Sequence, residues 1–273
     1  MLPTYFLAHG SPTNALEENY FTQDWLNLTT ELNNHPIPEA IVIFSAHWHT
    51  PNTLITANHH PPTIHDFGGF SNALYNCQYP CPGNPELAKA IKTLLNTNHI
   101  NCELSEAWGL DHGSWVLLKH LYPEANVPVL QISLDNSHND LHQHYNIAQQ
   151  LKPLREQGIL FIGSGNIVHN ISKWMSMRQD SPINWAVEFD KSIHDAISNN
   201  LFEHIADYQQ LPFANEAVPT IEHFLPLIYC LGLHGDQHHQ WDTKGITHSD
   251  FGFNNLSTAC SRSIAFAGSL LSP

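Results

Sequence analysis

The chain has 273 residues, of which 10 are basic and 25 acidic, so its formal charge is −15. This charge argues against nucleic acid and anionic membranes as partners, because both attract basic patches. The apolar runs fall short of the roughly 20 residues that a membrane-spanning helix needs, and the N-terminus lacks a secretory signal, so we expect a cytoplasmic protein.

Apolar runs of strand length alternate along the chain with stretches whose apolar residues recur every three to four positions. The predicted strands are residues 4–8, 40–46, 53–57, 127–133, 158–163 and 263–267. The predicted helices are residues 17–32, 85–95, 138–154, 184–197 and 218–231. This alternation predicts an α/β fold with a central, mostly parallel mixed sheet that helices cover on both faces. The sequence contains no Gly/Ser-rich linker, so we expect one domain over residues 1–273.

Five cysteines are scattered through the sequence. Cys77 and Cys81 form the closest pair, but no second pair lies nearby, as a zinc knuckle would require. We therefore expect reduced thiols, as is usual in a cytosolic protein.

Histidine is the unusual component of the chain, with 21 residues. His9 follows the first predicted strand, His47 follows the second, and His169 follows the strand at 158–163 and its "GSG". Ligands of open α/β sheets bind beyond the carboxyl ends of the strands. The pattern therefore predicts that these histidines meet at one edge of the sheet, where imidazoles can hold a metal or move a proton.

Two further segments contain candidate site residues. "GLDHGSW" places His112 between an acid and a glycine just before a helix-like run, and "TIEHFLPL" sets Glu222 and His223 at the start of an apolar helix. The alternative for the second pair is a surface position at a helix N-terminus, where a glutamate favours the dipole. Ser164, in "IGSGN", lacks the G-x-S-x-G context of a nucleophile.

The candidate donors suit more than one metal on chemical grounds alone. Two histidines with a carboxylate or a third histidine, and open positions, are typical of non-haem Fe(II). The same three ligands suit a catalytic zinc that holds one water. The sequence leaves both possibilities open at this point.

Seven motifs occur in an order that resembles a known family. They are "HGSP" (9–12), "SAHW" (45–48), "DFGGF" (66–70), "YPCPG" (79–83), "GLDHGSW" (109–115), "GSGNIVHN" (163–170) and "EHFLPL" (222–227). In this order they resemble the class III extradiol ring-cleavage dioxygenases. The resemblance is to the 4,5-DOPA dioxygenase-like branch, which is related to the catalytic subunit of protocatechuate 4,5-dioxygenase, and it runs nearly from end to end.

The resemblance implies a role for each candidate residue. His9, His47 and His223 match the metal ligands, and Glu222 is the rival for the third position. His169 matches the acid/base that faces the substrate. His112 matches a histidine that lies beside the substrate and oxygen, and Asp111 matches the acid that orients it. Phe67 and Ser11 match substrate-binding residues.

The resemblance also implies the chemistry and the partners. We expect Fe(II) in the active form, Zn(II) in the protein as isolated, and a DOPA-like catechol and O2 as small-molecule partners that yield a ring-opened semialdehyde. The low share of charged residues is compatible with a homo-oligomer. Two alternatives stay open: a zinc hydrolase with Glu222 or His169 as general base, and a non-catalytic metal-binding interaction protein of the same fold.

Overall fold

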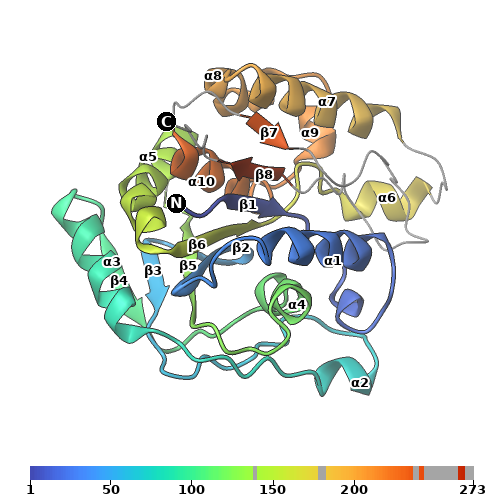
Figure 1. Ribbon diagram of the computed structural model, residues 1–273. Helices are drawn as coiled ribbons and strands as arrows, with labels where there is room; N and C mark the ends of the chain where they lie inside the picture. Colours follow the sequence, from blue (N-terminus) through green and yellow to red (C-terminus); the bar gives the residue numbers. More distant parts are fainter. Residues whose placement is uncertain (138–139, 178–182, 236–239, 243–263, 268–273) are drawn as a thin grey trace.

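The strands form one mixed sheet in the computed structural model, which describes residues 1–137, 140–177, 183–235, 240–242 and 264–267 (Figure 1). The strand order is β4-β3-β5-β2-β6-β1-β8-β7. In chain order the strands are β1 (Thr4–Leu7), β2 (Ala40–Thr50), β3 (Thr53–Thr56), β4 (Cys102–Ser105), β5 (Val129–Asp135), β6 (Ile159–Ser164), β7 (Gln240–Asp242) and β8 (Ile264–Ala267).

The centre of the sheet is parallel, as the sequence predicts. β2 pairs in parallel with both β5 and β6, and β6 pairs in parallel with β1. Antiparallel pairs join β3 to β5, β1 to β8 and β7 to β8. The carboxyl ends of β2, β6 and β1 therefore lie side by side at one edge of the sheet.

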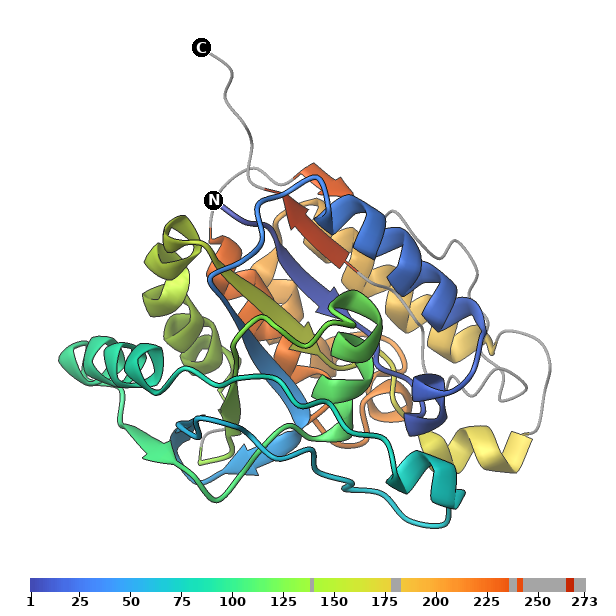
Figure 2. The same cartoon turned by 60° about the horizontal axis from the view of Figure 1, so that its bottom comes forward.

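Side chains alternate across the central strands because successive residues of a strand point to opposite faces. Tyr5, Leu7, Ile41 and Ile43 enter one apolar cluster, which α1 and α4 cover. Phe6 and its counterparts in β2 enter the other cluster, which α5, α7 and α10 cover. Figures 1 and 2 show these helices on the two faces of the sheet, so the predicted α/β architecture is confirmed.

The helices are defined by apolar periodicity and by caps. Asn84 caps α3 through Leu87 N, and Pro85 occupies the first turn, where its missing N–H costs nothing. The α-helices are α1 (Tyr20–Leu32), α2 (Asn72–Tyr75), α3 (Pro85–Thr97), α4 (His112–Leu121), α5 (Leu141–Leu151), α6 (Ile171–Met177), α7 (Asn184–Ser198), α8 (Phe202–Ala206), α9 (Ala214–Ala217) and α10 (Leu225–His234). Short 3-10 helices cover Pro12–Ala15, Lys152–Gln157 and Tyr208–Gln210.

Several predicted boundaries were wrong. The helix predicted at 218–231 begins only at Leu225, because Pro226 fits a first turn and residues 218–224 contain turns and bends. Strands β4 (CELS) and β7 (QWD) were not predicted, because each contains a charged and a polar residue and so forms no apolar run. The predicted first residues of two elements, His138 and Ser263, lie outside the described residues.

Two expectations concern the whole chain. Within the described ranges, no helix is long and apolar enough to cross a membrane. The cysteines that the structure describes, Cys77, Cys81, Cys102 and Cys230, are free thiols.

Candidate metal centre

Two of the candidate ligands lie near the carboxyl ends of β1 and β2, the two parallel strands that flank β6. His9 follows β1 by two residues, and the chain turns at Gly10, whose φ of +60° favours glycine. His47 lies within β2, where the pairing with β5 is irregular between Phe44 and His49. Such irregularities re-aim side chains at the ends of strands. Both imidazoles therefore reach the same edge of the sheet.

The third candidate, His223, approaches this edge because β6 ends in small residues. A Cβ at Gly165 would lie 2.3 Å from the carbonyl oxygen of His223, and one at Gly163 would lie 2.6 Å from that of Pro226. The same carbonyl of His223 accepts the N–H of Asn166 at 2.7 Å. The glycines of "GSGN" thus leave room for the turn that contains His223 and precedes α10.

These three histidines form one cluster, in which His9 and His223 are buried and His47 is half-buried. One ring nitrogen of each lies within 4.8 Å of the others. Nε2 of His9 is 3.0 Å from Nε2 of His47, and the His223 ring centroid lies 5.3 Å and 5.1 Å from those of His9 and His47. Burial and the neighbouring histidines hold the pKa of each ring well below its ordinary value. The imidazoles are therefore neutral at pH 7, the form that binds metal.

Hydrogen bonds to the cluster test whether it suits a cation. The Ser164 hydroxyl donates to Gly113 O at 2.5 Å, so its oxygen must accept from Nδ1 of His9, 2.9 Å away. Nε2 of His9 then carries a lone pair. Nδ1 of His47 faces a carboxylate oxygen of Asp66 at 3.4 Å, which favours a lone pair on its Nε2 as well. Two lone pairs 3.0 Å apart repel unless a cation lies between them, so this donor set fits a metal.

His169 stacks against the cluster. Its ring lies 3.5 Å from that of His223 between centroids, with only 6° between the planes, and its backbone N–H donates to Ala217 O at 2.8 Å. Burial lowers the pKa of His169 to about 4, and the charge of Glu222 opposes this shift. Glu222 is half-buried and, among the described residues, does not belong to the groups whose donor atoms converge. The structure thus brings His223, and not Glu222, to His9 and His47.

His112 lies beside the cluster, 4.0 Å from the His47 ring between centroids. It is the first residue of α4, so the prediction that it lies in a loop just before the helix was wrong. Its Nδ1 is 2.9 Å from Asp66 Oδ2, and its backbone N–H donates to Asp66 Oδ1 at 2.8 Å. The predicted orienting acid was Asp111, and the structure corrects this to Asp66.

Asp111 has a different set of partners. As the N-cap of α4 it accepts the N–H of Ser114, and it also accepts the hydroxyl of Ser45 at 2.6 Å and the amide of Gln131. Burial, then the charge of Asp66, raises the pKa of Asp111. Ser45 lies two residues before His47 and opposite Ser164 in the sheet. Asp111 therefore supports the strand ends beneath the histidines.

Asp66 was missed in the sequence, although "DFGGF" contains it. Burial acts to raise its pKa, but hydrogen bonds from His112 and the charges of His112 and His47 outweigh burial, so the pKa lies below its ordinary value. Asp66 is therefore a carboxylate at neutral pH. Asp66 reaches His112 because residues 62–64 pair with residue 110, which is 46 positions beyond residue 64, and a contact over this separation leaves no local pattern in the sequence.

The two predicted substrate residues lie in different surroundings. Phe67 packs edge to face on His112, with 5.8 Å between ring centroids, and also contacts Tyr75. The Ser11 hydroxyl instead caps a 3-10 helix and accepts the N–H of Thr13 at 3.3 Å. Phe67 thus borders the histidines, whereas the substrate role of Ser11 stays a prediction.

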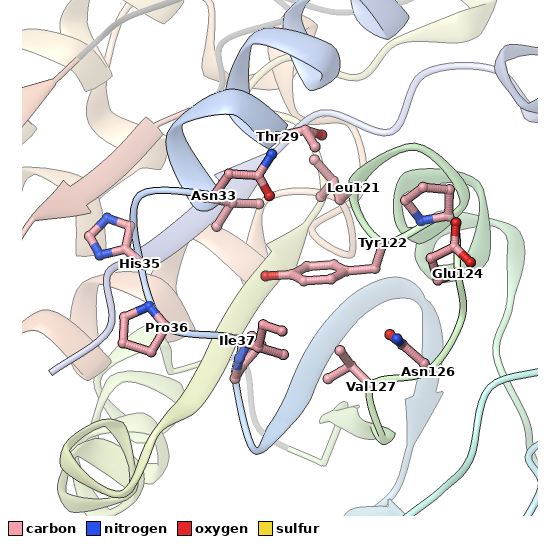
Figure 3. A pocket seen from close by; sticks show the side chains of 13 residues that line it. Thr29, Asn33, His35, Pro36, Ile37, Leu121, Tyr122, Glu124, Asn126 and Val127 are labelled. Atoms are coloured by element: carbon pink, nitrogen blue, oxygen red, sulfur yellow. The ribbon is translucent and has the colours of Figure 1, made fainter.

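A pocket of about 510 Å³ lies at the other edge of the sheet (Figure 3). Its lining residues precede β2 and β5, at the amino ends of these strands: Thr29, Leu32, Asn33, His35, Pro36, Ile37, Pro38, Leu121, Tyr122, Pro123, Glu124, Asn126 and Val127. None of these is a residue of the histidine cluster. The pocket is therefore separate from the candidate centre.

Comparisons with known proteins agree with this geometry. A bacterial relative from Escherichia coli K12, called 4,5-DOPA dioxygenase extradiol, is 41% identical over 85% of this chain and 84% of its own length. A plant protein of the same name from Mirabilis jalapa is 35% identical over 90% and 94%. The crystal structure of an uncharacterized protein from E. coli K12 superposes with a TM-score of 0.79 at 32% identity, covering 98% of this chain and 100% of that one.

A family match covers most of the sequence. Residues 3–256 match the family described as the catalytic LigB subunit of aromatic ring-opening dioxygenase. This range includes all of the histidines, glycines and carboxylates described above. The chain therefore belongs to the family of catalytic LigB subunits of aromatic ring-opening dioxygenases.

Proposed function

We propose that this chain is a metal-dependent extradiol dioxygenase that opens the ring of a catecholic, DOPA-like substrate with O2 and releases a ring-opened semialdehyde. The observation that carries the proposal is the convergence of His9, His47 and His223, three neutral imidazoles, two of which place lone pairs 3.0 Å apart that need a cation between them. The names of the relatives, 4,5-DOPA dioxygenase extradiol, make DOPA the first substrate to test.

Fe(II) is the proposed metal of the active form, and Zn(II) is expected in the isolated protein because imidazoles bind both. His9, His47 and His223 would hold the ion. Bound Fe(II) would act as a Lewis acid toward the catechol oxygens and supply the redox chemistry that lets O2 react with the ring.

The protein would supply the proton transfers. His169 is neutral at pH 7 and lies against His223, so a ring nitrogen can accept a proton from a catechol hydroxyl. His112 lies beside His47 and Phe67, where its imidazole can return a proton to an oxygen of the product. Phe67 would form part of an aromatic wall for a planar substrate.

The wider assignments rest on composition and on the sheet. Free thiols among the described cysteines support a cytoplasmic location, and the charge of −15 supports small molecules as partners and disfavours nucleic acid and membranes. Pairing of β1 with β8 supports a single catalytic domain over residues 1–273. The small number of charged residues supports a homo-oligomer, which light scattering tests.

Oxygen uptake tests the proposal. Metal-stripped protein is reloaded with Fe(II) without air and given a panel of catechols that includes DOPA. We expect rapid uptake with a yellow ring-opened product, lost in His169→Ala and kept in the matched control His204→Ala, whose side chain is exposed on α8. Folded, Fe(II)-loaded protein that takes up no oxygen with any catechol would refute it.

A further inference from the structure

One carboxylate lies between two imidazole rings to which the proposed function gives different tasks. Oδ2 of Asp66 is 2.9 Å from Nδ1 of His112 and 3.4 Å from Nδ1 of His47. Oδ1 of Asp66 accepts the backbone N–H of His112 at 2.8 Å. The Asp66 side chain is 16% exposed, although the residue as a whole, backbone included, is exposed.

Hydrogen bonds between two loops hold Asp66 in place. The N–H of Ile64 donates to Leu110 O at 2.7 Å, and the indole N–H of Trp115 donates to Ile64 O at 2.9 Å. These bonds fix the segment before Asp66 alongside the segment that enters α4. Asp66, two residues beyond Ile64, then faces His112, two residues beyond Leu110.

A carboxylate accepts hydrogen bonds and donates none, so a ring nitrogen that faces it is favoured in its N–H form. A neutral imidazole has one N–H, and placing it on Nδ1 leaves the lone pair on Nε2. We propose that Asp66 is a positioning residue that fixes both His47 and His112 in the Nδ1–H tautomer. His47 then offers Nε2 to the metal, and His112 keeps Nε2 free to accept or return a proton.

This inference rests on the proposed function for the tasks of the two Nε2 atoms, whereas the tautomers follow from the contacts alone. Carboxylates behind metal-binding histidines commonly fix the tautomer of the ligand. Here the same carboxylate also fixes a ring that is not among the three candidate ligands. One residue of the "DFGGF" loop would thus set the chemical form of two site residues from different elements, β2 and α4.

The substitution Asp66→Asn gives a directional test. The backbone N–H of His112 still requires an acceptor, so the amide oxygen takes the place of Oδ1. The amide NH2 then faces Nδ1 of both rings, and a donor there favours the opposite tautomer, with the proton on Nε2. His112 can switch freely, whereas His47 can switch only by giving up the metal.

The tautomers are read by NMR of the zinc-loaded protein labelled with 15N in histidine, with the His112 signals assigned from their loss in His112→Gln. We expect Nδ1–H at His112 in the wild type, Nε2–H in Asp66→Asn and Nδ1–H again in Asp66→Glu. The matched control Asp195→Asn, on the exposed face of α7, should match the wild type. Nε2–H at His112 in the wild type would overturn the inference even if no variant folds.

Zinc affinity provides the second measurement and concerns His47. We expect Asp66→Asn to bind zinc about 10–100-fold more weakly than the wild type and the control, as the loss of partners behind metal ligands typically does. Unchanged affinity together with an unchanged tautomer would overturn the role of Asp66. Neither readout depends on turnover. A wild type that cleaves no catechol would therefore refute the proposed function, whereas the role of Asp66 would still be decided by the NMR and zinc-affinity measurements.

Discussion

The approach of His223 to the strand ends depends on Gly165, and replacing this glycine with alanine measures how much. The new Cβ would lie 2.3 Å from the carbonyl oxygen of His223 and 3.0 Å from Cγ of Pro226. Ordinary contact needs at least 3.4 Å, so the turn must move by about 1 Å. Overpacking of this kind costs about 1–3 kcal/mol, and disturbing the bond from Asn166 to that carbonyl adds about 1 kcal/mol.

We therefore expect Gly165→Ala to lower the free energy of unfolding by about 2–4 kcal/mol and to weaken zinc binding about 10–100-fold. Urea unfolding of the metal-free protein and competition with a chromogenic chelator measure the two effects. The matched control is Gly68→Ala, since a Cβ at Gly68 would meet no atom within 4 Å. If Gly165→Ala keeps both the stability and the zinc affinity of that control, the close approach does not position His223.

Four further predictions test other features of the protein. Ser164→Ala removes the acceptor for Nδ1 of His9, so we expect a loss of about 1–3 kcal/mol in the free energy of unfolding and weaker zinc binding by chelator competition. The pKa of His169 is about 4 in the folded metal-free protein against 6.5 when unfolded, so the unfolded state binds more protons between these values. Urea unfolding should therefore show stability that is constant above pH 7 and falls as pH drops from 6.5 to 4, by on the order of 3 kcal/mol from this residue, and equal stability at pH 7 and pH 4 would contradict it. Zinc at 100 times its Kd should raise the free energy of unfolding by about 2.7 kcal/mol, and EDTA should reverse the rise. Arg155→Met removes buried hydrogen bonds to Leu2 O, so it should lower the free energy of unfolding by about 3 kcal/mol without changing zinc affinity.

The sequence by itself predicted the architecture because the central strands are local patterns. The runs that end near His9, His47 and Ser164 are apolar on both sides, as strands covered by helices on both faces must be. Their carboxyl ends therefore indicated where the site lies. The edge strands β4 and β7 contain charged and polar residues in place of an apolar run, and their pairing depends on the rest of the sheet.

The sequence also predicted which histidines matter, but the choice among neighbouring acids was decided by tertiary structure. Asp111 adjoins His112 and looked like its partner, yet an N-cap carboxylate turns back toward its own helix and here reaches Ser45. Asp66, 46 residues away, reaches His112 because two loops pair along their backbones. Local sequence specifies the caps and strands of a segment, whereas contacts between distant loops exist only once the sheet has brought them together.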